Sequence, residues 1–304
     1  MNKDTALNDK FSTTRLLTNV KPCIALKGND KFDSILLLPE NKQRVAEGGL
    51  RVKGFFKGSY AKKPLISIVT IVYNGEAYLD KTIRSVLNQN YDNVEYIIID
   101  GGSTDETLDI IKKYDDSIDY WVSEGDQGIS DAFNKGIRCC SGELIGLINA
   151  DDYYEENAFE HVVNKYIKNL ALAEMVIYGN TNKITIDGVK KIKNSSKLSW
   201  CLSVPFSHCS SFLTSAYYKE YGLFNTKYKI GMDVDLLMRG VKSAHYIEIS
   251  NFIATQRDGG VSDKSRLVGY KEYRQIAKSH FGFVLSNLGY MIKLIVYCKN
   301  KVFR

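Results

Sequence analysis

A regular alternation of uninterrupted apolar runs with segments of helical periodicity begins near residue 65 and limits most strongly what this chain can fold into. The apolar runs are rich in β-branched residues and lack polar alternation, as strands buried on both faces do. These strands are expected at residues 65–73 (LISIVTIVY), 94–100 (VEYIIID), 118–122 and 143–149 (ELIGLIN). Helices are expected at residues 76–87, 103–113, 129–138 and 157–167. The alternation predicts an α/β fold with a Rossmann-like parallel sheet and flanking crossover helices.

The pattern loosens after Met175, where a mixed half is expected to continue the same domain. Asp187-Gly188 lies between two short alternating runs, which predicts a hairpin. Later strands near residues 210–214 and 252–256 flank a helix that is expected to start around Asp233. In the first half, Ser103 or Thr104 is expected to cap the second helix.

These patterns divide the chain into three parts. Residues 1–63 are polar and weakly periodic, which indicates an N-terminal extension, and residues 64–262 form the main domain. Residues 263–304 are expected to be helical, and from residue 281 onward they are apolar with basic residues near the end. An amphipathic helix lying on a membrane surface has this composition, and so does a helix packed on the protein's own core. Both interpretations stay open.

Composition excludes few classes. Of the 304 residues, 44% are hydrophobic and 25% are charged, as in an ordinary folded protein. The net charge of +6 suits a phosphorylated ligand or an anionic membrane surface as well as nucleic acid. The aromatic residues are scattered and form no RNA-binding signature, so no nucleic-acid partner is expected.

The cysteines and the N-terminus favour a cytoplasmic protein. The six cysteines show no CxxC spacing, so reduced, buried thiols are expected in place of a disulfide framework. The first residues lack the apolar run of a signal peptide. No stretch of about 18 uncharged apolar residues is evident, so nothing in the sequence clearly spans a membrane.

Acidic residues follow three of the predicted strands, at the sheet edge where open parallel sheets bind ligands. Asp100 ends the second strand, and Asp126 follows the third within EGDQG. Asp100 suits a contact with a base or ribose, although a turn-forming role before Gly101-Gly102 explains it equally well.

Asp151 and Asp152 directly follow the fourth strand, as INADD. Two adjacent carboxylates in an apolar setting repel each other, and a divalent cation that bridges diphosphate oxygens would relieve this repulsion. The alternative is that one of them caps a helix. Asp233 and Asp235 open a later helix, where acids favour the helix dipole or where one could act as a general base.

Taken together, the motifs resemble glycosyltransferase family 2. PLISIVTIVYNGEAYLDKTIRSVLNQNYDNVEYIIIDGGSTDET is similar to the opening of that family, and GDQGISDAFNKGI, INADD, GLFNTKYKIGMDVDLLMRG and RDGGVS follow in the family's order. The resemblance covers about residues 64–262. It implies a GT-A fold, a divalent cation (Mn²⁺ or Mg²⁺), inversion at the anomeric carbon and a nucleoside-diphosphate sugar donor, foremost a UDP-sugar.

The resemblance also assigns roles to individual residues. It implies that Asp233 is the catalytic base and that Asp151, with Asp152 beside it, holds the metal. The residues that it implies contact or border the donor are Thr70, Val72, Tyr73, Asn74, Asp100, Asp126, Asn134, Lys135, Asn149 and Arg257, with the Gly259-Gly260 loop closing over the diphosphate.

Two positions depart from the family pattern. Asn149 replaces the first Asp of the D-x-D motif, which puts a second metal ligand there in doubt, and Met232 replaces an acid often found before the base. His208, in PFSHCSSF, stands where related enzymes carry a His near the sugars, but a core histidine is the favoured interpretation.

The expected activity is addition of one sugar. Processive synthases of the family carry a QxxRW motif, and neither Trp121 nor Trp200 belongs to one. The expected acceptor is a lipid-linked saccharide in surface-polysaccharide assembly, such as O-antigen or capsule, at the inner face of the cell membrane. Two alternatives stay open: a non-catalytic scaffold that binds nucleotide sugars, and a sugar nucleotidyltransferase, which expects a basic Gly-rich loop where this chain has Tyr73-Asn74-Gly75-Glu76.

Overall fold

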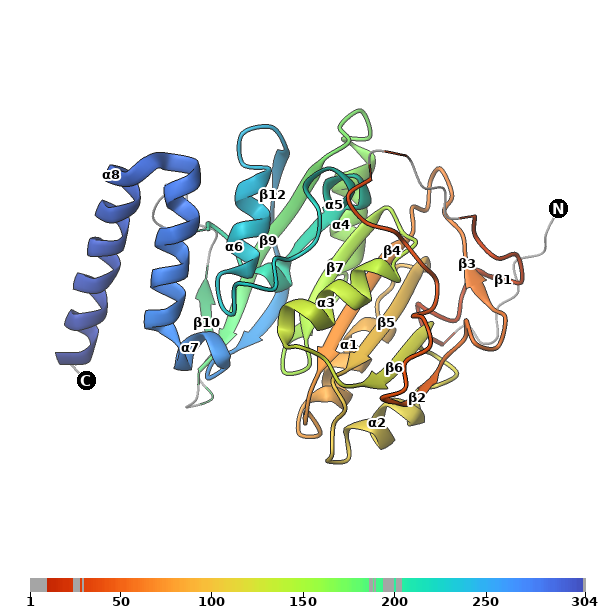
Figure 1. Ribbon diagram of the computed structural model, residues 1–304. Coiled ribbons are helices and arrows are strands. Elements are labelled where there is room, and N and C mark those ends of the chain that lie inside the picture. Colours follow the sequence, from red (N-terminus) through yellow and green to blue (C-terminus); the bar gives the residue numbers. More distant parts are fainter. Residues whose placement is uncertain are drawn as a thin grey trace.

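The computed structural model describes residues 10–302 except 24–27, 29, 186–187, 189, 194–199 and 201–203. The described residues build a ten-stranded sheet between two layers of helices (Figure 1). Its order is β2-β6-β5-β4-β7-β11-β9-β12-β8, with β10 paired to β9. The strands are β2 (Arg44–Gly48), β4 (Ile66–Val72), β5 (Val94–Asp100), β6 (Tyr120–Glu124), β7 (Leu144–Asn149), β8 (Tyr153–Tyr154), β9 (Met175–Ile184), β10 (Lys190–Lys193), β11 (Ser211–Thr214) and β12 (His245–Arg257).

The sheet has a parallel half and a mixed half, as predicted. Strands β6, β5, β4 and β7 are parallel, and their residues are buried along almost their whole length, which explains the uninterrupted apolar runs. Beyond β7 the pairings alternate in direction, because β11 runs antiparallel to both β7 and β9 while β12 runs parallel to β9. The predicted hairpin is present as β9 and β10, although Asp187 lies outside the described residues.

A hydrophobic core lies on each face of the sheet. Helices α1 (Leu79–Leu87), α2 (Thr107–Lys113) and α4 (Ala158–Ile167) cover one face, where Ile83, Ile111 and Phe159 join Ile68 of β4. Helices α3 (Ile129–Arg138), α5 (Ser215–Tyr221) and α6 (Met232–Arg239) cover the other face, where Phe133, Tyr217 and Leu236 join Val69. Adjacent residues of β4 therefore enter opposite cores, as the pleat requires.

The predicted start of the second helix was wrong. Helix α2 begins at Thr107, and neither Ser103 nor Thr104 caps it. The Ser103 hydroxyl donates instead to Asp100 Oδ1, and Asn74 Oδ1 accepts a hydrogen bond from the Thr104 N–H. Both residues belong to the loop after β5, which contacts the loop after β4 through Asn74, so tertiary contacts override the local capping preference.

Residues before Pro64 contribute to the main sheet. Strand β2 pairs antiparallel with β6, and β1 (Leu17–Thr18) forms a separate two-stranded sheet with β3 (Phe56–Lys57). The Arg51 guanidinium is buried against Glu95 of β5 and donates to the carbonyl oxygens of Leu36 and Cys139. A buried pair of this kind is costly to break, because removing one partner leaves an unpaired charge.

The C-terminal residues form α7 (Val261–Lys264) and α8 (Arg266–Val302). Helix α8 is interrupted at Gly282, whose φ of 81° and ψ of 175° reverse the chain, so that two helical halves lie side by side at one end of the molecule (Figure 1). Aromatic contacts join the halves: the rings of Tyr270 and Tyr297 lie 6.3 Å apart, and Lys293 Nζ lies 3.8 Å from the Tyr273 ring centroid. We call this element the C-terminal hairpin.

One helix among the described residues is long and apolar enough to cross a membrane by length and composition alone. It spans residues 266–299, and its most apolar window has a mean hydropathy of 1.5 with 11% of the window buried. Residues 281–298 carry Lys293 as their only charged residue. Such a helix is weak evidence for a span, since in this structure it folds back on itself at Gly282.

Candidate functional site

The parallel strands end in register, and this row of strand ends is the base of the candidate site. Val72 of β4 lies opposite Asp100 of β5, and Asp100 lies opposite Ser123 of β6. On the other side of β4, Asn149 of β7 lies opposite Ile71. The carboxyl ends of the four strands therefore share one edge, where open α/β sheets bind ligands.

Asp100 is fully buried and holds the loop that follows it. Its carboxylate accepts hydrogen bonds from the N–H and hydroxyl of Ser103 and from the hydroxyl of Ser123. Three donors, two from the loop after β5 and one from strand β6, make this carboxylate a fixed part of the strand ends. The position of the Asp100 carboxylate relative to a bound base is therefore fixed by these neighbouring side chains.

Tyr73, Asn74 and Asp126 lie beside that loop. Asn74 has a positive φ of 49° and is fixed through its N–H, which donates to Ser103, and its side chain, which accepts from Thr104. Tyr73 is 65% exposed. A Cβ on Gly101 would stand 2.5 Å from Asp126 Oδ2 and 3.5 Å from the Tyr73 ring, so only glycine permits Asp126 to approach this strand end so closely. Tyr73, Asn74 and Asp126 together form an open polar surface at the strand ends, which we call the shelf and which suits a nucleoside.

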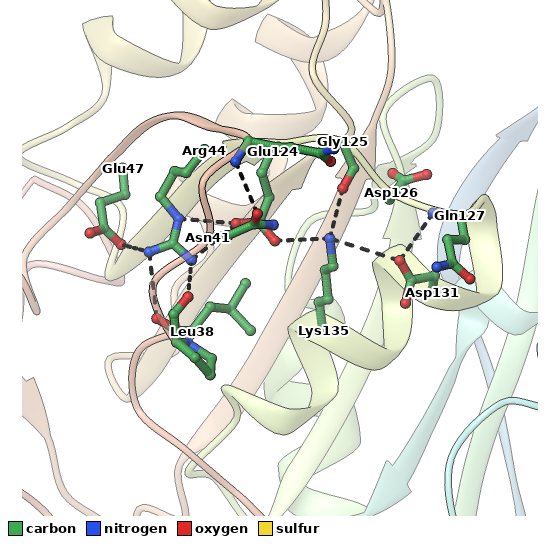
Figure 2. A network of polar contacts seen from close by, with 12 residues as sticks. Leu38, Asn41, Arg44, Glu47, Glu124, Gly125, Asp126, Gln127, Asp131 and Lys135 are labelled. Atoms are coloured by element: carbon green, nitrogen blue, oxygen red, sulfur yellow. Dashed lines mark hydrogen bonds and ion pairs between the residues drawn. The ribbon is translucent and has the colours of Figure 1, made fainter.

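Lys135 does not point freely into this shelf. Its ammonium lies 2.9 Å from Glu124 Oε1 and donates to the carbonyl of Gly125, and Glu124 is also paired with Arg44 of β2 (Figure 2). Burial alone would raise the pKa of Glu124, but hydrogen bonds from Lys135 and Arg44 hold this pKa below its usual value. The network fixes residues 124–128, the loop that carries Asp126.

Two other predicted donor residues face the protein. The Thr70 hydroxyl is buried and lies 2.9 Å from the Tyr96 hydroxyl. The Asn134 side chain forms a pair of hydrogen bonds with the backbone of Phe224, donating to its carbonyl and accepting from its N–H. As arranged, both side chains support the site from behind, and Val72, 5% exposed, offers a ligand little more than its backbone.

The two carboxylates after β7 have different surroundings. Asp152 is 2% exposed and accepts hydrogen bonds from the Arg257 N–H at 2.9 Å and from Asn149 Nδ2 at 3.3 Å. Burial, followed by the repulsion of Asp151, raises the pKa of Asp152 to about 7. Burial likewise raises the pKa of Asp151, whose side chain is half-buried. Asp152 therefore joins β7 to β12, and Asp151, one position before it, is the more exposed of the two carboxylates.

Arg257 completes this side of the site. Its guanidinium lies over the Tyr78 ring at 4.0 Å, and its Nε is buried with no hydrogen-bond partner among the described residues. An unpaired buried donor on a cation is costly, and an anion would satisfy it.

Asp233 lies across from this strand end, in the first turn of α6. Its Oδ2 lies 3.3 Å from Nδ1 of His208, and Nε2 of His208 lies 3.2 Å from Nδ2 of Asn149. Asp233 Oδ1 is buried and has no hydrogen-bond partner within the described part of the chain. Burial raises the pKa of Asp233, and His208 opposes this shift. Asp233 and His208 line a small cavity together with the apolar residues Leu147, Leu213, Phe224, Leu236 and Leu237.

The segment before α6 is held by the C-terminal hairpin. The Glu272 carboxylate of α8 accepts hydrogen bonds from the N–H groups of Lys229, Ile230 and Gly231, at 3.0, 2.9 and 2.7 Å. Tyr273 and Ile276 of the same helix pack against Met238 of α6. The position of Asp233 thus depends on residues that lie near the C-terminus.

The structure brings the two predicted chemical centres into one site, because Asn149 contacts both Asp152 and His208, and His208 contacts Asp233. Sequence reasoning undervalued His208, whose signal was its place in PFSHCSSF, and it missed Arg44 and Glu272, for which the sequence offers no local signal. Among the described residues, no group of three or more His, Cys, Asp or Glu side chains is arranged to hold a metal by itself.

Comparisons with known sequences identify a family. Residues 67–235 match the family described as Glycosyl transferase family 2. An uncharacterized glycosyltransferase of Rickettsia typhi is 30% identical over 225 residues, 70% of this chain and 70% of that protein. Another, from Rickettsia felis, is 33% identical over 195 residues, and this chain covers only 32% of its length. The chondroitin synthase of Escherichia coli is 34% identical over 127 residues, 41% of this chain and 18% of the synthase.

Solved structures show the same fold. TarS of S. aureus in complex with UDP-GlcNAc has a TM-score of 0.56 and 17% identity, over 70% of this chain and 64% of TarS. The mannosyltransferase PcManGT from Pyrobaculum calidifontis, in complex with GDP-Man and Mn²⁺, has a TM-score of 0.56 and 14% identity, over 78% of this chain and 76% of that one.

Proposed function

This chain belongs to glycosyltransferase family 2 and has the GT-A fold, and on that premise we propose that it transfers a single sugar from a nucleoside-diphosphate sugar to an acceptor hydroxyl with inversion. The observation that carries the proposal is the environment of Asp233. One carboxylate oxygen faces His208, and the other is buried without a partner, across from the strand end that carries Asp151. A carboxylate with a raised pKa on a side chain that is 26% exposed is suited to accept a proton.

The donor is proposed to lie along the row of strand ends. Tyr73, Asn74, Asp100 and Asp126 would border the nucleoside, and the unpaired Nε of Arg257 would bind the diphosphate. Lys135, Asn134, Thr70 and Asn149 are proposed to shape this pocket through the contacts that they make within the protein. A UDP-sugar is the first candidate, since TarS was crystallised with UDP-GlcNAc, although PcManGT holds GDP-Man.

The residues present fit a divalent cation held jointly with the donor. Asp151 is half-buried with a raised pKa, so a cation beside it would relieve the cost of its charge. Mg²⁺ and similar cations bind in proteins through one or two carboxylates plus substrate phosphates, which suits a site without a three-residue protein cage. When bound, such a cation would neutralise the charge on the departing diphosphate. Asp152, which lies behind Asp151, is proposed to keep it oriented.

The protein's own residues then perform three tasks. Arg257 holds the diphosphate end of the donor, beside which Asp151 would hold the divalent cation, and the shelf at Tyr73 and Asp126 holds the nucleoside end. Asp233 removes the proton of the incoming hydroxyl as the bond to the anomeric carbon forms from the side opposite the diphosphate, which gives inversion.

The acceptor is proposed to be a lipid-linked saccharide at the cytoplasmic face of the membrane, as in surface-polysaccharide assembly. The support is the C-terminal hairpin, whose second half exposes a continuous apolar surface. The residues of this surface are between 40% and 74% exposed: Phe283, Val284, Leu285, Leu288, Met291, Ile292, Ile295 and Val296. A helix of this kind would lie in the interfacial layer of a bilayer.

Release of nucleotide in the presence of Mn²⁺ tests the enzymatic proposal. The protein is incubated with single UDP- and GDP-sugars and with polyprenyl-diphosphate saccharides as acceptors, and the products are identified by mass spectrometry and by the configuration of the new linkage. We expect one donor to give a single added sugar with inverted configuration. A product with several added sugars or retained configuration would contradict the proposal.

Flotation with vesicles tests the membrane contact. The double variant Val284→Ser/Ile295→Ser should lose most binding to vesicles that contain anionic phospholipid, because it removes two of the most exposed apolar side chains. Val45→Ser is the matched control, since Val45 is 67% exposed on β2 at the other end of the sheet. Equal flotation of the double variant and the wild type would contradict membrane binding by the C-terminal hairpin.

A further inference from the structure

His208 is the residue through which the two halves of the site touch. It lies in η1 (His208–Ser210), just before β11, and the Ser211 hydroxyl donates to its carbonyl oxygen at 2.8 Å. The edge of the imidazole faces the ring of Phe133, with 6.3 Å between the ring centroids. Backbone and ring are therefore fixed by packing, and both ring nitrogens lie at polar side chains.

The partners of Asn149 decide which ring nitrogen of His208 carries a proton. Asn149 Nδ2 lies 3.3 Å from Asp152 Oδ2, and a carboxylate oxygen accepts, so the donating amide nitrogen is on this side. The same nitrogen lies 3.2 Å from His208 Nε2, which must then accept the second amide hydrogen. A neutral imidazole that accepts at Nε2 carries its proton on Nδ1.

We infer, resting on the proposed function, that Asn149 fixes His208 as the Nδ1–H tautomer and that His208 in turn positions Asp233 for the acceptor hydroxyl. Nδ1 lies 3.3 Å from Asp233 Oδ2, a distance that can shorten when the substrate is bound. Oδ2 is thereby held by this N–H, while Oδ1 is buried and has no hydrogen-bond partner among the described residues.

This inference gives a physical reason for the departure at Asn149. An ionised aspartate in its place would offer only acceptor oxygens to Nε2, so Nε2 would have to carry a proton, and Nδ1 could then donate to Asp233 only in the doubly protonated imidazolium. In this chain the Asn149 amide acts on Asp233 through His208, while Asp151 remains the residue that faces the diphosphate. His208 is thus a positioning residue, and it acts through Asp233.

The tautomer is measured directly by NMR of protein with ¹⁵N-labelled histidine. The chain has four histidines, so the His208 signals are assigned by their loss in His208→Asn. We expect the Nδ1–H tautomer in the wild type and a shift toward Nε2–H in Asn149→Leu, which keeps the volume but removes the amide donor. An Nε2–H tautomer in the wild type would overturn the inference, whether or not the protein transfers sugar.

Kinetics provide the second test. His208→Ala should lower kcat at least tenfold with little change in the donor KM, and His208→Asn should recover most of that loss, because its amide can donate from near the position of Nδ1. His245→Ala is the control, since His245 is exposed at the start of β12. Equal losses in His208→Ala and His208→Asn, or a loss that appears only in the donor KM, would show that His208 merely fills space.

Discussion

The donor side and the base side of this site are built in different ways. The donor side is built from the ends of neighbouring parallel strands. Asp100 ends β5, and Tyr73 and Asp126 follow β4 and β6. On the base side, His208, Asp233 and Glu272 come from η1, α6 and α8, and only long-range contacts bring them into register. The donor side is therefore specified by local motifs, whereas the base side is specified by how distant segments pack. Substitutions should reveal this difference as changes in donor binding on one side and in turnover on the other.

The largest effect is expected for Asp233→Asn. The amide keeps the volume and can still contact His208, but it cannot accept a proton, so kcat should fall by about 10²–10⁴-fold while donor affinity stays within about twofold. Initial rates of transfer and calorimetry with a nucleotide sugar measure the two quantities. Full activity in this variant would exclude Asp233 as the base.

Asp151→Asn should act on the donor side and depend on metal. Removing the charged ligand should weaken Mn²⁺-dependent donor binding and lower kcat/KM by about 100-fold or more, which corresponds to several kcal/mol. Asp109→Asn, an exposed carboxylate on α2, is the control. Titration of Mn²⁺ should show a higher requirement in Asp151→Asn only. An unchanged requirement would place the metal elsewhere.

The pH dependence should report the base side. Burial raises the pKa of Asp233, and a base works only when ionised, so activity should fall about tenfold per unit as the pH drops below this raised pKa. The acidic limb of the kcat profile should therefore lie above the usual range for aspartate. The pKa of Asp152 is raised to about 7, so Asp152 could also contribute an acidic limb, and the profile of Asp152→Asn separates the two groups. A limb at the ordinary aspartate pKa in both proteins would contradict the assignment.

The strands and the helix that carry the donor side could be predicted from the sequence because each of these features is local. The strands at residues 65–73 and 94–100, the helix at residues 129–138 and the acids that follow the strands could all be found from apolar runs and strand ends. The sequence did not predict that Asn134 binds the backbone of Phe224, 90 residues away, or that Thr70 turns toward Tyr96. Those orientations depend on which segments meet in space, and a pattern of residue types along the chain does not contain that information.

Glu272→Gln tests whether the C-terminal hairpin supports the base. The carboxylate accepts three backbone N–H groups before α6, and a neutral amide would lose part of each bond, about 1–3 kcal/mol in total. We expect a lower Tm and a kcat reduced by roughly tenfold, with donor affinity unchanged. Glu220→Gln, at an exposed glutamate of α5, is the matched control. A loss of donor affinity with normal kcat would contradict the division between the two sides.

Arg44→Gln should give the smallest effect, and it should fall on the donor side. Arg44 and Lys135 together hold Glu124, and Glu124 precedes the loop that carries Asp126 (Figure 2). Because Lys135 still pairs with Glu124 when Arg44 is replaced, we expect the loss to cost only about 1 kcal/mol, which should raise the donor KM roughly fivefold without changing kcat. Arg84→Gln removes an exposed pair with Asp80 on α1 and should change neither constant. If Arg44→Gln lowered kcat and left KM intact, the N-terminal segment would support the base and not donor binding. The division of the site into a donor side and a base side would then be contradicted.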